Sequence, residues 1–322
     1  MNTLAFLLVL LWVQPAASPP ATTYETLLQA GQLALKRGNL EEALEALHHA
    51  VALRPDGAEA HFQLGEIYWR REAYREAVIE LRRANAAEPD QPQYALRLAV
   101  LYAQLQQFPQ ARALLEDFLR RRQDFAEAIF LLARIALEQN DFPEAERQLR
   151  HFLELTPGDP KGLAELGTAL LSEGKATEGV PLLQQAVDKA PELGAAHLNL
   201  GVFYSQRGEL EPARRHLEAA VGLLPDDAKA QFQWGNLLLH LGETSKAEAA
   251  LRRASTLNPN LLEAHYALAG LWRRQGRTEE ADRALRAYQR LSEEALTASQ
   301  RRRQLAALHA ELRGFQIGRA HV

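Results

Sequence analysis

The chain matches itself when it is shifted by 34 residues, and this periodicity constrains its fold more than any other feature. Eight registers follow one another without an insertion or a deletion. A period of this length is typical of solenoids, in which each repeat buries its apolar face by stacking on its neighbours. At 322 residues the chain is also too long for one ordinary compact core. The registers begin at Tyr24, Ala58, Pro92, Ala126, Pro160, Gly194, Ala228 and Leu262.

Small residues recur at two places in the register, where two helices have to come close together. The first place follows an apolar residue, as in Leu64-Gly65, Leu166-Gly167 and Leu200-Gly201. A proline then closes most registers, because proline lacks an amide donor and ends a helix. The recurring alanines are Ala43, Ala77, Ala111, Ala145, Ala213, Ala247 and Ala281, and the closing prolines are Pro55, Pro89, Pro157, Pro191, Pro225 and Pro259.

Residues that tolerate a positive φ angle lie near the middle of most registers. This position marks the end of a first helix in a left-handed cap. Together with the two small positions and the closing proline, it predicts one helix–turn–helix per 34 residues. The residues concerned are Gly38, Asn140, Gly174, Gly208, Gly242 and Gly276.

The third repeat departs from this pattern. Ala99 takes the place of the small glycine, and Gln123 takes the place of the closing proline.

The pattern resembles the tetratricopeptide repeat. The resemblance implies an all-α fold, a right-handed superhelical solenoid of eight helix–turn–helix repeats whose first helices line a concave groove. It also implies a protein-binding scaffold or assembly factor, and no enzyme. The implied repeats span residues 24–57, 58–91, 92–125, 126–159, 160–193, 194–227, 228–261 and 262–295, followed by a C-terminal capping helix over 296–316.

Composition and motifs exclude several other classes of function. A net charge of −4 gives no broad positive field, so we expect no nucleic-acid partner. The absence of cysteine excludes disulfides, thiolate metal sites and thiol nucleophiles. None of the common catalytic or nucleotide-binding motifs is found, and we predict no catalytic residue and no cofactor. The open alternative is that the repeats are the recognition arm of a larger enzyme, such as a glycosyltransferase or a peptidase.

Three histidines, His61, His197 and His265, recur at the fourth position of their repeats. Recurrence at the repeat period favours a structural role over metal binding, because a metal site needs several ligands that converge on one point. We therefore predict packing histidines and no metal.

The two ends of the chain have patterns of their own. Residues 1–17 contain an apolar run, Leu4 to Val13, followed by small residues, which is the layout of a secretory signal peptide. The run is too short for a permanent membrane span. A buried helix or an uncleaved anchor is the alternative. With residues 18–23 as a linker, the expected location is periplasmic or extracellular, and the excess of arginine over lysine favours a GC-rich bacterial source. Residues 317–322 match the translation of a sequencing adapter and are set aside as an artefact.

The resemblance also implies which residues form the groove. The fifth position of every repeat is apolar, and the twelfth position adds a second apolar stripe in most repeats. The predicted partner is a protein or peptide segment that presents apolar side chains, although the same stripes could instead pack helices together. The predicted groove residues are Leu28, Phe62, Trp69, Leu96, Phe130, Leu137, Leu198, Phe232, Leu239 and Tyr266.

Overall fold

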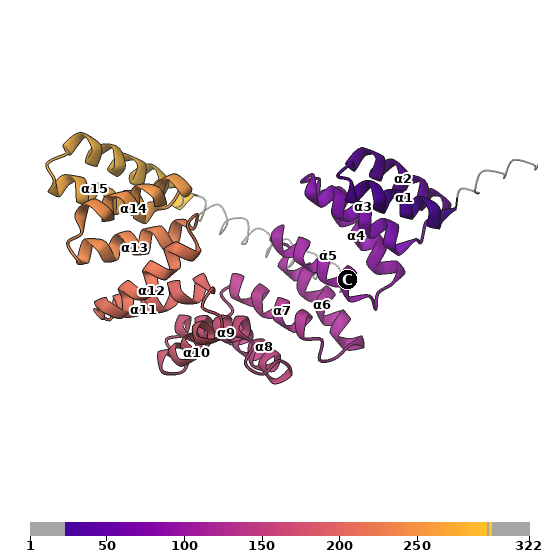
Figure 1. Ribbon diagram of the computed structural model, residues 1–322, viewed down its shortest axis with the longest axis horizontal. Coiled ribbons are helices and arrows are strands. Elements are labelled where there is room, and N and C mark those ends of the chain that lie inside the picture. Colours follow the sequence, from indigo (N-terminus) through magenta and orange to yellow (C-terminus); the bar gives the residue numbers. More distant parts are fainter. Residues whose placement is uncertain (1–22, 295, 298–322) are drawn as a thin grey trace, which may run out of the picture. The chain divides into compact units, whose positions relative to one another are not determined.

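The computed structural model describes residues 23–294, 296 and 297, and every regular element within them is an α-helix. Figure 1 shows short helices that follow one another through tight turns. The predicted all-α helical-repeat solenoid is therefore confirmed. The helices are α1 (Tyr24–Lys36), α2 (Leu40–Leu53), α3 (Ala58–Arg70), α4 (Tyr74–Ala87), α5 (Pro92–Gln104), α6 (Phe108–Arg121), α7 (Ala126–Glu138), α8 (Phe142–Leu155), α9 (Pro160–Ser172), α10 (Ala176–Lys189), α11 (Gly194–Gln206), α12 (Leu210–Leu223), α13 (Ala228–His240), α14 (Thr244–Leu257) and α15 (Leu262–Arg274), and a last helix begins at Thr278.

The contacts divide the chain into two compact units. The N-terminal unit extends to Ile135 and contains α1 to α6 with most of α7, and the C-terminal unit begins at Ala136. Within each unit the closest contacts join the two helices of one repeat, and the second helix then packs against the first helix of the next repeat. Each odd-numbered helix begins at the first residue of a 34-residue register.

Several predictions fall outside the described residues. They are the signal peptide at 1–17, most of the linker at 18–23, nearly all of the capping helix at 296–316 and the artefact at 317–322. The last helix is described from Thr278 to residue 294 and again at 296 and 297.

The turn inside each repeat requires a left-handed residue. All eight repeats have a positive φ at their fifteenth position, between 57° and 79°. Six of these residues are the glycines and the asparagine that the sequence singled out. The other two are Glu72 and Gln106. The left-handed backbone conformation costs a residue with a side chain roughly 1–2 kcal/mol. The sequence missed them because neither residue type signals a left-handed turn.

The two helices of a repeat meet where glycine faces leucine. A Cβ atom added to Gly65 in α3 would lie 2.6 Å from Cγ of Leu81 in α4, which is closer than van der Waals contact allows. Gly31, Gly167, Gly201 and Gly235 face a leucine in the same way. These leucines are completely buried, as are most of the recurring alanines. Close approach of the helices therefore depends on the missing side chain.

The third repeat meets this constraint differently. Ala99 carries a Cβ atom toward α6, and Phe118 stands where most other repeats have alanine. Phe118 is completely buried and packs edge-on against Phe125 at 5.3 Å between ring centroids. As a result α5 and α6 approach each other less closely than α1 with α2 or α3 with α4. The helix α6 still ends at Arg121, at the usual position, although no proline follows it.

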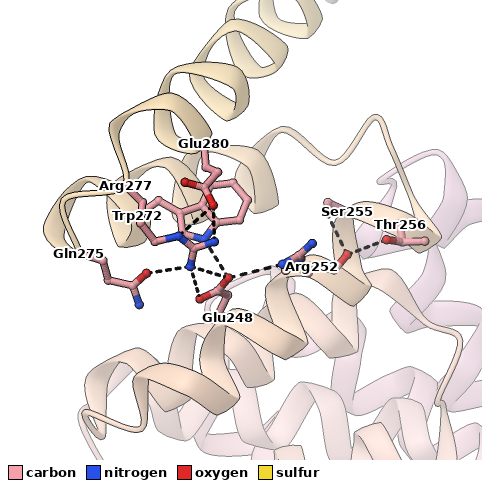
Figure 2. Close-up of polar contacts among 8 residues, drawn as sticks. All are labelled: Glu248, Arg252, Ser255, Thr256, Trp272, Gln275, Arg277 and Glu280. Atoms are coloured by element: carbon pink, nitrogen blue, oxygen red, sulfur yellow. Dashed lines mark hydrogen bonds and ion pairs between the residues drawn. The ribbon is translucent and has the colours of Figure 1, made fainter.

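Ion pairs join consecutive repeats of the C-terminal unit. A residue at position 21 of one repeat meets a residue at position 16 of the next in Glu146–Lys175 (2.7 Å), Arg214–Glu243 (2.8 Å) and Glu248–Arg277 (2.9 Å). Figure 2 shows the last of these, where Arg277 lies between Glu248 on α14 and Glu280 on the last helix. The Trp272 indole also donates to Glu248 at 3.0 Å. In the first two repeats of the N-terminal unit position 21 is instead apolar, with Leu44 and Val78 packed against the core.

We expect Gly65→Ala to lower the free energy of unfolding by about 1–3 kcal/mol, because the new methyl group would force α3 and α4 apart. Gly222→Ala in α12 is the matched control, since no atom lies within 4 Å of its added Cβ. This control should be neutral or raise stability by up to about 1 kcal/mol, through helix propensity alone. Urea denaturation followed by circular dichroism measures both. Equal effects at the two sites would contradict the proposed contact.

Candidate functional site

The recurring histidines donate hydrogen bonds to the closing prolines. Nε2 of His61 lies 2.9 Å from the Pro55 carbonyl oxygen, and Nε2 of His265 lies 2.8 Å from that of Pro259. His197 makes the same bond to Pro191. Gln231 takes this position in the seventh repeat and donates to Pro225 at 3.1 Å. Each of these side chains therefore fastens a repeat to the end of the preceding one, which supports the structural role predicted for the histidines.

His61 carries a buried ion pair in addition. Its Nδ1 lies 2.5 Å from Oε2 of Glu80, and Arg83 binds the other oxygen of that carboxylate at 2.8 Å. The imidazole is 3% exposed and Glu80 is 8% exposed. The hydrogen bond that His61 donates to Glu80 raises the pKa of His61, although burial opposes this shift. Because both ring nitrogens face acceptors, the protonated imidazole fits this site best.

His197 instead faces a second histidine. Its Nδ1 lies 3.1 Å from Nδ1 of His216, and Tyr204 stacks on His216 at 5.7 Å between ring centroids. Burial lowers the pKa of His197, and burial and then His197 itself lower the pKa of His216. A single shared hydrogen bond between two neutral rings satisfies this geometry. Among the described residues, no three histidine, aspartate or glutamate side chains converge as metal ligands.

The predicted groove residues of the N-terminal unit are half-buried. Leu28 packs against the core around Leu47, and Phe62 and Leu96 pack against the core around Leu98. The ring of Phe62 lies 5.0 Å from that of Tyr94. Much of the apolar stripe is therefore used to pack helices.

Trp69 is fixed by its neighbours on the same surface. Its indole N–H donates to Oε1 of Gln104 at 2.9 Å, and the guanidinium of Arg97 lies 4.8 Å from its ring centroid. Arg97 also pairs with Glu66, Nε to Oε1, at 2.8 Å. Burial raises the pKa of Glu66, and the charges of Arg97 and Arg70 oppose this shift. Trp69 is half-buried and packs against the same core as Phe62 and Leu96.

A cavity of about 450 Å³ lies between α1 and α3, on the surface that the first helices form. We call it the α1–α3 pocket. Glu59 holds two of its lining side chains, because Gln63 donates to it at 2.7 Å and Gln32 at 3.5 Å. Among the residues that the structure describes, Lys36 and Arg70 have no ion-pair partner. The α1–α3 pocket is lined by Gln32, Leu35, Lys36, Gln63 and Arg70, and it combines an apolar floor with two available cations.

A second cavity of about 400 Å³ lies between α9 and α11 in the C-terminal unit. Its polar groups are neutral, and Asn199 donates to the hydroxyl of Thr168 at 2.7 Å. Ser172 and Gln206 add further hydrogen-bonding groups, and Leu171, Val202 and Phe203 supply apolar surface.

The remaining predicted groove residues differ in exposure. Leu198, Phe232 and Leu239 are half-buried and pack against cores of the C-terminal unit. Tyr266 is 62% exposed and touches Tyr288 at 5.3 Å between ring centroids. Phe130 and Leu137 lie on α7, in different units, and both are half-buried.

Sequence reasoning missed the polar side chains that line both cavities. They lie at the sixth, ninth and thirteenth positions, where residue type varies between repeats. No periodic signal exists for such residues. Their proximity follows from the packing of consecutive first helices.

The fold defines a helical-repeat protein, and cavities lie between consecutive first helices of its repeats. Models described as tetratricopeptide repeat match residues 58–91, 96–160, 170–233 and 232–295, and a model described as TPR repeat matches residues 31–72. Together they match more than half of the chain. The chain belongs to the tetratricopeptide-repeat family, a class of protein–protein interaction scaffolds.

Solved structures share the fold at low sequence identity. A tetratricopeptide repeat protein from Parabacteroides merdae ATCC 43184 is 17% identical with a TM-score of 0.64, over 80% of this chain and 98% of its own. A chain of the Cut9 and Hcn1 hetero-tetramer of the APC/C is 19% identical with a TM-score of 0.61, over 77% of this chain and 54% of the matched chain. Human IFIT1, in a dimer with m7Gppp-AAAA, is 17% identical with a TM-score of 0.55, over 84% of this chain and 69% of the matched chain. No curated protein matches the sequence.

None of the described helices is both long and apolar enough to cross a membrane.

Across pH 5.5 to 8.5, Glu80→Gln should affect stability most at the acidic end. The folded pKa of His61 is raised, so its contribution is complete below the unfolded value of about 6.5 and is lost as the pH rises through the folded pKa. We expect the free energy of unfolding to fall by about 2 kcal/mol near pH 6 and by less at high pH. Urea denaturation at each pH measures the difference from the unchanged chain.

Arg83→Gln is the control for Glu80→Gln. Its guanidinium is 59% exposed, so the change should cost less than about 1 kcal/mol with no comparable pH dependence. A constant difference between Glu80→Gln and the unchanged chain at every pH would contradict a protonated His61.

Phe62→Ser and Tyr266→Ser occupy the same repeat position and should behave differently. Phe62 packs against a core, so its loss should cost about 3 kcal/mol or more. Tyr266 is mostly exposed, so its loss should cost less than about 1 kcal/mol. Denaturation midpoints of the two variants test this. Similar losses would show that exposure does not separate packing residues from contact residues along this stripe.

Proposed function

We propose that this chain is an exported scaffold or assembly factor that binds a segment of a partner protein along its first helices. The observation that carries the proposal is the α1–α3 pocket. Leu35 offers apolar surface there, and Lys36 and Arg70 lie beside it without an ion-pair partner among the described residues. A segment that presents an apolar side chain next to a carboxylate satisfies both features.

The neighbouring residues favour a partner that supplies its own negative charge. The carboxylates nearest to the pocket are already engaged, Glu59 by two glutamines and Glu66 by Arg97. An incoming carboxylate therefore meets little competition for Lys36 and Arg70. The half-burial of the apolar stripe agrees with this, because packed side chains such as Phe62 leave only part of their surface for a ligand.

Export is the second part of the proposal, and it is supported by the apolar run and small residues at 1–17. Mass spectrometry of the protein recovered from its host tests it. A mature chain that begins near residue 18 supports export, and an intact N-terminus in the cytoplasmic fraction contradicts it.

The α1–α3 pocket is tested with a peptide display library selected on the full chain. Peptides that pair Asp or Glu with a large apolar residue should be enriched. A Lys36→Glu, Arg70→Glu double variant should weaken their binding at least tenfold, because two attractive charges become repulsive. Binding should also weaken as salt increases. Fluorescence anisotropy with labelled peptides measures both effects.

The control for this double variant is Arg37→Glu with Arg75→Glu. Both residues are exposed, carry the same charge and lie outside the pocket lining. Their reversal should change binding less than twofold. Enriched peptides without acidic residues, or equal losses in the two double variants, would overturn the proposed site.

A further inference from the structure

The third repeat opens a furrow on a different surface of the N-terminal unit. A cavity of about 650 Å³ lies among α4, α5 and α6, with no residue in common with the α1–α3 pocket. We call it the α4–α6 furrow. Leu98 and Tyr102 of α5 are buried at its floor, and Ile79 of α4 and Leu114 of α6 form its walls. Ile79 is 49% exposed, so a ligand can reach it.

The two helices of the third repeat lie less close together than those of the first two repeats. Ala99 replaces the glycine that lets leucine fit closely in other repeats, and Phe118 adds a large side chain at an alanine position. The second helix α6 therefore stands away from α5. The space between α4 and α6 is left unfilled above the α5 residues.

Polar groups in the α4–α6 furrow lack partners. Oδ1 of Asn85 is buried and has no hydrogen-bond partner within the described part of the chain. A buried acceptor without a partner costs about 1–3 kcal/mol, so a ligand that donates a hydrogen bond would recover this loss. Arg82 likewise forms no ion pair with any described residue. Burial raises the pKa of Tyr102, and the charge of Arg82 opposes this shift.

The charges around the α4–α6 furrow are of one sign. Arg82 and Arg83 are among its lining residues, and no aspartate or glutamate is. Glu80, which follows Ile79 on α4, is held by His61 and Arg83. A ligand with a carboxylate is therefore favoured over a neutral or a basic one.

We propose that the α4–α6 furrow is a second docking site, which takes an extended segment of a partner protein with an apolar side chain next to an aspartate or glutamate. The apolar side chain fills the space between Ile79 and Leu114, and the carboxylate pairs with Arg82. An extended backbone supplies a free N–H for Asn85. A helix has no such donor beyond its first turn, because its other amides are already bonded.

The test uses peptides displayed on phage and selected on the full chain carrying Lys36→Glu and Arg70→Glu, so that the α1–α3 pocket is disabled. Enriched peptides should combine an acidic and a large apolar residue. Ile79→Ser and Arg82→Glu, each added to this background, should weaken their binding at least tenfold. Fluorescence anisotropy measures the affinities, and circular dichroism confirms that each variant is folded.

Leu33→Ser and Arg75→Glu are the matched controls. Leu33 is 48% exposed, close to the exposure of Ile79, and Arg75 lies on the same helix as Arg82 but outside the furrow. Both should leave binding within twofold.

Four results would overturn the α4–α6 furrow as a docking site. These are the absence of enriched peptides, enriched peptides without acidic residues, binding insensitive to Ile79→Ser and Arg82→Glu, and equal losses in the controls. A dimer in sedimentation that Ile79→Ser dissolves, and that no peptide displaces, would assign the surface to a second copy of this chain. Because the selection is made with the α1–α3 pocket disabled, failure here leaves the proposed function intact.

Discussion

The rest of the structure depends on how closely the two helices of a repeat can approach. Where glycine lies opposite a leucine, the leucine side chain packs directly against the backbone of the first helix and is fully buried. Neighbouring repeats inherit this spacing, because each second helix is also the surface on which the next repeat packs. In the third repeat Ala99 and Phe118 replace the small residues of most other repeats, and the α4–α6 furrow lies beside this pair of helices.

Consecutive repeats are joined by ion pairs as well as by apolar packing. The C-terminal unit uses ion pairs between positions 21 and 16, with the acidic partner on either side, as Glu146–Lys175 and Arg214–Glu243 show. In the N-terminal unit Leu44 and Val78 are apolar at position 21, and ion pairs at other positions join consecutive repeats, such as Glu41–Arg71. Partly exposed ion pairs of this kind are screened by salt.

The histidines illustrate how one structural role permits two electrostatic states. Both His61 and His197 form a hydrogen bond to the backbone of the preceding closing proline. The second ring nitrogen then faces a carboxylate in one case and another imidazole in the other. Protonation consequently stabilises the first site and is disfavoured at the second. Opposite responses to acid within one chain follow from a single residue at position 23 of the repeat, Glu80 in one case and His216 in the other.

The helices, their order and the residues at their closest contacts could be predicted from the sequence. These features are set by neighbours along the chain, and the 34-residue period repeats each signal often enough to be recognised. Which apolar residues remain accessible could not be predicted, because it depends on how the helices pack in the tertiary structure. Phe62 and Tyr266 share a repeat position, yet one packs against a core and the other is largely exposed. The cavities, the partners of Glu80 and His216 and the strained turns at Glu72 and Gln106 were decided there too, because they depend on the distance between helices and not on the pattern within one.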